Sequence, residues 1–375
     1  MQGVPENGIF HYMRNSAIHG TRDTVAKPSA TSLVDSLEQR LRELLPGPWR
    51  IERQQPTRSG GAQPDAVFAI HGPAGASSLL VVEAKRYLDP KDIPAVAAQL
   101  RSYGGHDPGM VVTPFLSPRS RQLLADYGIA YADATGNLRL ELVAPAAFLL
   151  LGGSDNDPWR EARPLHSLKG SAAGRVVRAL CEFHPPYGIR ELAQRSRTSA
   201  PSVSRVVALL DREALVTRGR RGEVVAVQWS QVLRRWVQDY GMLTANHVYN
   251  YLEPRGHAAL VQKLRVASLL YAITGSLAAA RLAPIAASRL GVVYVEGAEL
   301  AAEHLGLRPA ETGANVLLAE PYNPVVFERT ELDDGVTYAA AAQVAADLLT
   351  SPGRGPAEGE ALLQWMEEYE SAWRH

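Results

Sequence analysis

The chain has 375 residues, 46% of them hydrophobic, and its 39 lysines and arginines balance 39 aspartates and glutamates. This balance excludes a uniformly basic protein, and a single cysteine, Cys181, excludes a disulfide framework and a cysteine zinc site. The length predicts two or three domains of roughly 100–200 residues each. Charge is uneven: residues 171–240 carry 12 arginines and six acids, whereas residues 292–375 carry four basic groups and 15 acids. A basic middle and an acidic end are typical of a nucleic-acid-facing module followed by a partner-facing one.

The first unit is predicted to be an α/β domain over residues 31–151, after a flexible arm at residues 1–30 that lacks hydrophobic periodicity. Leucines at helical spacing predict a helix over residues 33–45, with Ser32 as its N-cap. Apolar runs between turn residues then predict alternating strands and helices. The expected strands cover residues 49–54, 66–70, 79–82, 110–113, 129–132 and 138–143, and the expected helices cover residues 89–103 and 117–128.

Two carboxylates and a lysine stand at adjacent strand ends in this pattern. Asp65 precedes one expected strand, and Glu83 and Lys85 end the next, so the two acids are expected side by side. Carboxylate oxygens are ligands that suit Mg²⁺. Lys85, on the same face as Glu83, would orient a water or neutralise charge on a phosphate. Gln99 and Tyr103 lie one turn apart on the following helix.

These residues and the order helix, three strands, helix, strand resemble the PD-(D/E)XK nuclease superfamily. The spacing of Gln99 and Tyr103 is similar to the Gln-x-x-x-Tyr element of some of its branches. The resemblance implies a DNA endonuclease with Asp65 and Glu83 as metal ligands and with Asp65, Glu83, Lys85 and Gln99 as catalytic residues. The alternative is a domain that keeps the fold as a scaffold and grips DNA without cleaving it.

Two further expectations concern the acids of this domain. Glu38, on the first helix, is a weaker candidate for an additional acidic position. Repulsion between Asp65 and Glu83 predicts that removing either carboxylate raises the thermal stability of the metal-free protein.

The second unit, residues 170–240, follows a turn-rich linker at residues 152–169 and has the sharpest pattern of the chain. Helices are expected over residues 172–184, 190–196 and 200–213, and strands over 215–218 and 224–229 flank a basic loop at 219–222. Three helices and a hairpin in this order are typical of a winged helix-turn-helix that binds DNA. A winged helix used only for protein contacts is the alternative.

DNA contacts are assigned to the third of these helices, the turn before it and the hairpin. Small hydroxyl side chains at its start would let the helix approach the major groove, where Arg205 would reach a base edge or a phosphate. The other arginines would contact the backbone, and those of the hairpin would contact phosphates or the minor groove. The expected DNA-binding residues are Arg190, Arg195, Arg197, Ser199, Ser202, Ser204, Arg205, Arg218, Arg220 and Arg221. Such binding requires no cofactor.

The last unit, residues 241–375, is predicted to be a further α/β domain, with residues 230–265 mainly helical, strands at 292–295 and 316–318, and a final helix from about Pro356. Several stretches resemble the AbiEi-type antitoxin family of type IV toxin–antitoxin systems. They are residues 127–138 in the first domain and residues 271–281, 293–295, 323–327, 343–349 and 353–355 in the last. The pair Gly275-Ser276, which is followed by an expected strand, resembles the corresponding motif of nucleotidyltransferases. Tyr294 stands where that chemistry needs an acid, so a non-catalytic domain is expected.

The antitoxin resemblance implies a winged-helix repressor that controls its own operon and opposes a toxin. The leading expectation is a sequence-specific DNA-binding bacterial transcriptional regulator that represses its own or a neighbouring operon. The alternative is a Mg²⁺-dependent PD-(D/E)XK endonuclease targeted by its winged helix, and a third is an antitoxin that acts only through protein contacts. Expected partners are double-stranded DNA, a cognate toxin or other protein at the acidic C-terminal domain, and a second copy in a homodimer. A stand-alone regulator without a toxin is equally admissible.

The sequence also predicts where in the cell the protein is found. The apolar stretch at residues 269–295 is interrupted by Arg281 and Arg289, so no membrane span is expected. No basic-then-apolar start resembles a signal peptide. With a single cysteine, the chain is expected in the reducing cytoplasm, associated with the nucleoid.

Overall fold

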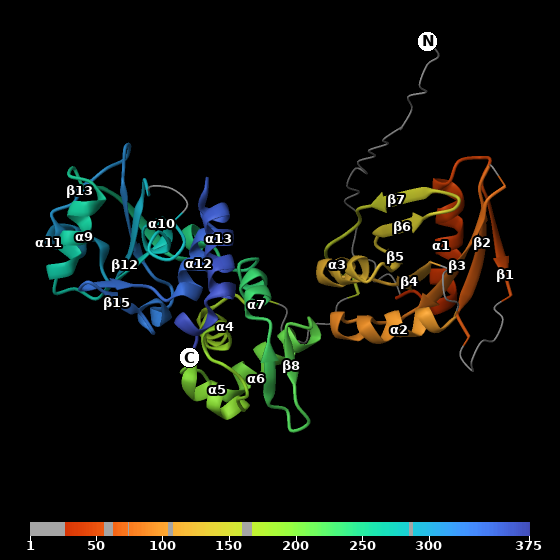
Figure 1. Cartoon of the computed structure of the whole chain (residues 1–375), viewed down its shortest axis with the longest axis horizontal. Helices are drawn as coiled ribbons and strands as arrows, with labels where there is room; N and C mark the ends of the chain where they lie inside the picture. The colour runs from red at the N-terminus through yellow and green to blue at the C-terminus, as the bar shows by residue number, and fades with distance from the viewer. Residues whose placement is uncertain (1–26, 56–62, 74, 104–107, 160–166, 285–287) are drawn as a thin grey trace, which may run out of the picture.

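The computed structural model describes residues 27–55, 63–73, 75–103, 108–159, 167–284 and 288–375. In these residues the chain is a multidomain α/β protein with two seven-stranded sheets and one two-stranded sheet. Figure 1 shows the N-terminal domain (residues 27–151) as one body and residues 167–375 as another. Most of the arm expected at residues 1–30, and part of the linker expected at 152–169, lie outside the described residues.

The N-terminal domain has the expected order of elements. Its sheet runs from β1 to β7 in chain order; β3, β4 and β5 are parallel, and the other neighbours are antiparallel. β7 has no counterpart among the expected strands, because apolar residues stand on both its half-buried and its exposed face, so it shows no alternation of apolar and polar residues. The elements are α1 (Ala30–Leu44), β1 (Arg50–Gln54), β2 (Ala66–His71), β3 (Ser77–Ala84), the 3₁₀ helix η1 (Pro90–Asp92), α2 (Ile93–Tyr103), β4 (Gly109–Thr113), α3 (Pro118–Asp126), β5 (Ala130–Asp133), β6 (Leu138–Leu142) and β7 (Ala147–Leu151).

The start of α1 differs from the expectation. Ser29 is its N-cap and not Ser32, because the Ser32 backbone N–H donates to Ser29 Oγ at 3.2 Å. Residues 30–32 are exposed and carry no apolar periodicity, so the leucine pattern alone places the start of the helix too late.

Each face of the N-terminal sheet carries its own hydrophobic core. Alternate residues of β2 to β5 pack with α1 on one face, and the intervening residues pack with α2 and α3 on the other. In β3, Leu80 and Val82 lie on the α1 side and Val81 lies on the α2 side. Because side chains alternate along a strand, Glu83 and Lys85 also lie on the α2 side, at the carboxyl end of β3.

The middle region (residues 171–240) contains the expected helices and hairpin. The turn between α5 and α6 places Arg197 at φ 47°, in the left-handed region that favours glycine. Pro201 lies in the first turn of α6, where its missing N–H costs no helical hydrogen bond. The elements are α4 (Ser171–Glu182), α5 (Ile189–Arg195), α6 (Ala200–Arg212), β8 (Val216–Arg218), β9 (Val224–Val227) and α7 (Trp229–Trp236).

The C-terminal region (residues 241–375) is built on a sheet in the order β13-β10-β14-β12-β11-β16-β15. The expectation that residues 230–265 are mainly helical is wrong at β10, where valine, tyrosines and leucine favour a strand. The elements are α8 (Met242–Ala245), β10 (His247–Leu252), α9 (His257–Val266), β11 (Tyr271–Thr274), α10 (Gly275–Ala279), β12 (Gly291–Val295), α11 (Ala298–Leu305), β13 (Arg308–Pro309), β14 (Val316–Glu320), η2 (Pro324–Phe327), β15 (Glu331–Asp333), β16 (Val336–Tyr338), α12 (Ala341–Leu349), α13 (Gly355–Glu368) and η3 (Glu370–Ala372).

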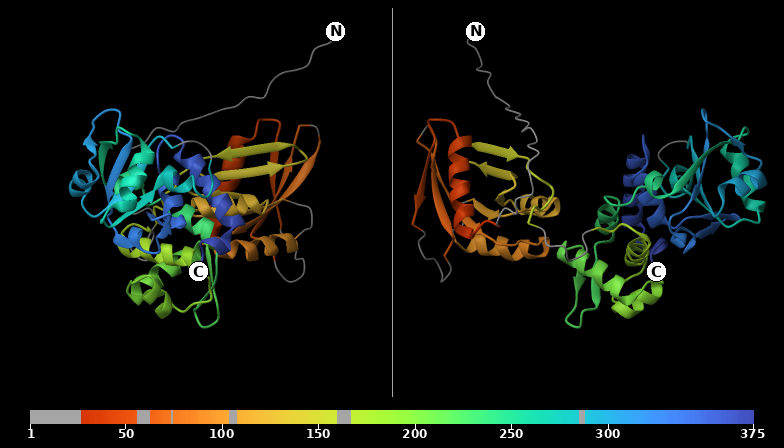
Figure 2. Two further views of the ribbon diagram at one scale, coloured as in Figure 1. Left: turned by 60° about the vertical axis from the view of Figure 1, so that its left-hand side comes forward. Right: turned by 180° about the vertical axis from the view of Figure 1, so that it is seen from behind.

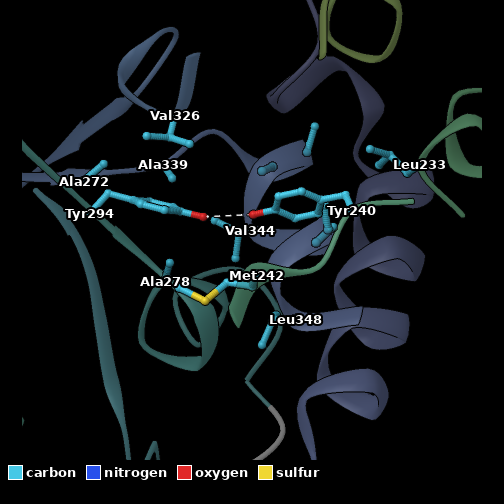
Figure 3. Close-up of a cluster of buried hydrophobic side chains, with 14 of the residues drawn as sticks. Leu233, Tyr240, Met242, Ala272, Ala278, Tyr294, Val326, Ala339, Val344 and Leu348 are labelled. Carbon is cyan, nitrogen blue, oxygen red and sulfur yellow. Dashed lines mark hydrogen bonds between the residues drawn. The ribbon is translucent and has the colours of Figure 1, made fainter. Parts of the chain in front are cut away.

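The middle and C-terminal regions share one hydrophobic core, which is continuous from Leu168 to Trp373. This core includes a buried polar group, in which the hydroxyls of Tyr240 and Tyr294 are 3.1 Å apart (Figure 3). The Tyr240 hydroxyl donates to Asp347 at 2.6 Å. Thr274 also donates to Asp347, at 2.5 Å. Burial raises the pKa of Asp347, and the hydrogen bonds that it accepts oppose that rise.

Arg178 of α4 joins the two regions through a side chain that is fully buried. Its guanidinium pairs with Glu182 of the same helix and donates to Gln343 Oε1 of α12 at 2.9 Å. It also donates to the carbonyls of Val325 at 3.4 Å and Glu328 at 3.3 Å. One side chain therefore holds α4 against two segments of the C-terminal region.

In the part of the chain that the structure describes, no helix has both the length and the apolar character needed to cross a bilayer.

We expect Arg178→Met to lower the free energy of unfolding by about 3–5 kcal/mol, because it breaks a buried ion pair and leaves Gln343 Oε1 and two backbone carbonyls without their donor. Urea denaturation at neutral pH measures this change. The matched control is Arg234→Met, which breaks the exposed pair with Glu360 and should cost about 0–1 kcal/mol. Equal losses in the two variants would contradict a central role for Arg178.

Candidate functional site

The first candidate site lies at the carboxyl end of β3, beside α2. Ala66 of β2 pairs with Val82 of β3, so Asp65, one residue earlier, stands across from Glu83. The Asp65 backbone N–H donates to Val82 O at 3.1 Å, and Asp65 Oδ2 accepts from the Ala84 N–H at 2.8 Å. The register of β2 and β3 therefore places the two acidic residues opposite each other, and the Asp65 carboxylate accepts from the backbone beside Glu83.

Glu83 is the centre of a hydrogen-bond network that joins β3 to α2. Lys85 Nζ lies 2.7 Å and Gln99 Nε2 lies 2.8 Å from Glu83 Oε1, and the Tyr103 hydroxyl donates to Glu83 Oε2 at 3.1 Å. Lys85 Nζ also donates to Gln99 Oε1 at 3.1 Å. Burial raises the pKa of Tyr103 above its usual value, so its hydroxyl keeps its proton. The structure thus brings together Glu83, Lys85, Gln99 and Tyr103.

Asp65 and Glu83 are the residues that would hold a metal ion if this domain bound one. Among the described residues, no three or more histidines, cysteines, aspartates or glutamates are grouped to hold a metal ion. Mg²⁺ needs fewer protein ligands than that, because it is usually held by one or two carboxylates and keeps several waters. The number and type of these two side chains therefore fit Mg²⁺, with water as the remaining ligands.

The other acids near the sheet do not join this pair. Glu38 pairs with Arg42 at 2.5 Å on α1, which packs on the opposite face of the sheet. Asp133, at the end of β5, accepts backbone N–H groups from Leu116 at 3.0 Å and Thr135 at 2.9 Å. Its carboxylate therefore serves the turn that follows β5.

The second candidate site combines the start of α6 with the hairpin. Figures 1 and 2 show α5, α6 and the loop between β8 and β9 at the same end of the molecule. Val203, Val206 and Leu210 bury one side of α6, which leaves the opposite side to hydroxyls and an arginine. The exposed members of the expected set are Arg190, Arg197, Ser199, Ser204, Arg205, Arg218, Arg220 and Arg221.

Two of the expected arginines have partners within the protein. Arg195 pairs with Glu191 at 2.6 Å, and its guanidinium lies 4.7 Å from the centre of the Phe183 ring. Arg197 lies 3.4 Å from Glu328 of the C-terminal region. The pair with Glu191 follows from i,i+4 spacing on α5. Sequence spacing does not reveal the other two contacts, because Phe183 precedes α5 and Glu328 lies 131 positions after Arg197.

Other expected side chains form hydrogen bonds within the start of α6 and within the hairpin loop. Ser199 Oγ donates to Ser202 Oγ at 3.0 Å, and Arg205 donates to Ser202 Oγ at 3.3 Å. Arg218 donates to Gly222 O at 3.4 Å across the hairpin loop. Arg220 and Arg221 are exposed on that loop.

Comparisons with known proteins add little to this geometry. No protein-family model matches the chain, and no curated protein matches it. A solved structure described as "Structure of EndoMS in apo form" aligns with 29% of this chain, at 18% sequence identity and a TM-score of 0.20. The aligned part spans about half of that protein, 47% of its length. A likeness of this size does not establish a shared fold.

The network around Glu83 reverses the expectation that its removal stabilises the metal-free protein. Glu83→Ala would leave the Lys85, Gln99 and Tyr103 donors without their shared acceptor, so we expect a loss of about 1–3 kcal/mol in the free energy of unfolding. Thermal and urea denaturation with and without EDTA measure this loss. Glu83→Gln keeps an acceptor and should lose less, and Glu52→Ala on the exposed edge strand β1 is the control. A higher melting temperature in Glu83→Ala would instead support the prediction that repulsion between Asp65 and Glu83 destabilises the metal-free protein.

Proposed function

We propose that residues 171–227 form a winged helix-turn-helix and that the protein is a sequence-specific DNA-binding transcriptional regulator. The observation that carries this proposal is the placement of the start of α6 and the arginine-rich hairpin loop at one exposed end of the molecule. The order of α4, α5, α6 and the β8–β9 hairpin supports the same assignment. Repression of its own or a neighbouring operon is the regulatory mode that we infer.

In this proposal the polar side of α6 enters the major groove of double-stranded DNA. Ser199, Ser202 and Ser204 are small, so the helix backbone can approach base edges closely. Arg205 is exposed on the same helix and bonded only to Ser202 among the described residues. A guanidinium at this position can donate two hydrogen bonds to a guanine.

In this proposal the hairpin contacts DNA in a way that does not depend on the base sequence. Arg220 and Arg221 stand at its tip, and Arg218 stiffens the loop through Gly222. Guanidinium groups on such a loop suit phosphates of the adjacent backbone, which position the protein without reading bases. Arg190 and Arg197 extend this cationic surface on the α5 side.

The C-terminal region is proposed as a partner-binding domain of AbiEi antitoxin type. Support comes from the sequence resemblance at residues 271–281 and 323–327 and from the excess of acids over residues 292–375. An acidic surface attracts a basic partner and repels DNA from that side of the molecule. The partner is a cognate toxin or a second copy of the chain.

A second candidate function is cleavage of DNA by the N-terminal domain as a PD-(D/E)XK nuclease. The observation that favours it is the cluster of Asp65, Glu83, Lys85 and Gln99 at the end of β3. Mg²⁺ held by Asp65 and Glu83 would supply a Lewis acid for the scissile phosphate. Lys85 would orient the attacking water or neutralise charge on the phosphate, and Gln99 would hold Lys85 and Glu83 in place.

We expect Arg220→Ala combined with Arg221→Ala to weaken binding to all DNA sequences and to lower the salt slope by roughly one unit per lost phosphate contact. Gel shifts or fluorescence anisotropy across a salt series measure both effects. The control is Arg255→Ala with Arg308→Ala, which removes the same charge from exposed positions of the C-terminal region. Unchanged affinity and slope in the hairpin variant would remove the hairpin from the interface.

Arg205→Ala should act differently, because a base contact is specific. We expect a loss of about 1–3 kcal/mol at the protein's own operator and a much smaller loss on random DNA. Competition gel shifts with the upstream region of its operon measure the ratio of the two affinities. An equal loss on both DNAs would assign Arg205 to a phosphate.

The regulator proposal predicts that the protein binds DNA and leaves it intact with Mg²⁺ or Mn²⁺. Supercoiled, linear and single-stranded DNA are incubated with wild type, Asp65→Ala, Lys85→Ala and the control Asp92→Ala, whose acid is exposed on η1. Metal-dependent nicking that is lost in Asp65→Ala and Lys85→Ala but kept in Asp92→Ala would establish the nuclease instead. DNA binding through α6 should survive in all four proteins, because none of the substitutions removes the contact between η1 and α6 that Lys91 and Asp211 form.

A further inference from the structure

The strand β7 forms one edge of the N-terminal sheet (Figure 1). Among the described residues it pairs with β6 alone, and no described backbone group outside that pairing is hydrogen-bonded to it. Alternate N–H and C=O groups of a strand point to its two sides, so those on the outer side of β7 are available to a further strand. The sheet can therefore be extended at this edge.

The composition of β7 sets it apart from the other edge strands. Natural proteins protect exposed edges from pairing with charges, with proline or with a short strand. The other edges of the two seven-stranded sheets follow this rule. β1 has the sequence RIERQ, β13 is an Arg-Pro pair, and β15 is the three residues Glu-Leu-Asp. β7 has the sequence AFLLL, without a charge or a proline, so its open edge favours pairing with another strand.

Two apolar side chains lie on the open face of β7. Phe148 is 59% exposed and Leu150 is 62% exposed. Their cross-strand neighbours on β6, Glu141 and Arg139, are paired with each other at 2.9 Å. The alternate residues of β7 are half-buried and pack against the core on the α1 side: Ala147, Leu149 and Leu151. β7 thus has one face that belongs to the core and one apolar face that is open.

We propose that β7 pairs antiparallel with β7 of a second copy of the chain, which joins two N-terminal sheets into one. With Leu149 at the two-fold axis, Phe148 of each copy lies opposite Leu150 of the other. The strand is then its own complement, because exposed apolar residues meet on one face and half-buried residues meet on the other. A register shifted by one residue would turn the second sheet over and mix the two faces.

The size of the contact sets the strength of the dimer. A second copy brings apolar side chains to both Phe148 and Leu150 without burying a charge. However, β7 offers five residues a side, whereas a standard protein interface uses about 20–30 a side. We therefore expect a weak dimer, with a Kd of about 10–100 µM. The contact uses neither α6 nor the acidic C-terminal region, so it is independent of the proposed DNA binding.

Sedimentation equilibrium on the full chain, from about 1 to 300 µM, measures the association. We expect the wild type to change from mainly monomer to mainly dimer over this range. Phe148→Lys combined with Leu150→Lys places like charges opposite each other in the dimer and should weaken it at least about tenfold. The control, Leu300→Lys with Leu332→Lys, adds the same charge at exposed leucines of the C-terminal region and should associate like the wild type.

Charge complementation tests whether the partner of β7 is β7 itself. Phe148→Glu combined with Leu150→Glu should be monomeric alone, like the lysine variant. When the two variants are mixed, lysines lie opposite glutamates, so we expect a heterodimer at least about tenfold tighter than either variant forms with itself. Sedimentation velocity with one variant fluorescently labelled measures the heterodimer. Circular dichroism establishes that each variant is folded.

Each of the following results would overturn the proposal. A wild type that stays monomeric up to about 300 µM would mean that the edge of β7 is unpaired or is covered by another segment of the chain. A dimer that survives the lysine substitutions in β7 would use another surface. Lysine and glutamate variants that do not associate when they are mixed would contradict pairing of β7 with itself.

Discussion

The buried guanidinium of Arg178 is the interaction on which residues 167–375 depend. A charged group without exposure requires partners on every side, and Arg178 finds them in Glu182, Gln343 and two backbone carbonyls. Glu182 is in turn paired with Arg329. These contacts fix α4 to α12 and to residues 325–329. Because α4 is also part of the core that supports α5 and α6, the exposed end of the molecule is positioned by the C-terminal region.

The local elements were largely predictable from the sequence, because most of them depend on hydrophobic period and capping. The helices of the middle region and the alternation in the N-terminal domain follow from apolar spacing and from residues that start a helix, such as Pro118. The juxtaposition of Asp65 and Glu83 was predictable because two antiparallel strands with a short turn have a restricted register. β7 and β10 were not, because neither shows a clean alternation of apolar and polar residues.

Features that depend on distant contacts could not be predicted. The middle and C-terminal regions look separate in the sequence, since charge changes sign between them, yet one core runs through both. The contacts of Arg195 with Phe183 and of Arg197 with Glu328 arise from packing and not from spacing. The contact between Tyr240 and Tyr322 could likewise not be predicted, because Tyr322 lies more than 80 positions after Tyr240.

Arg197 illustrates how this surface limits the choice of residues. Its backbone adopts φ 47°, where glycine is relaxed and an arginine is strained by about 1 kcal/mol or more. Glycine at this position would therefore make the turn between α5 and α6 more stable, but it would remove a cation from the proposed DNA-binding surface. Stability and affinity for DNA favour different residues here. The ion pair that the Arg197 guanidinium forms with Glu328 offsets part of this strain, and a glycine would lose that pair as well.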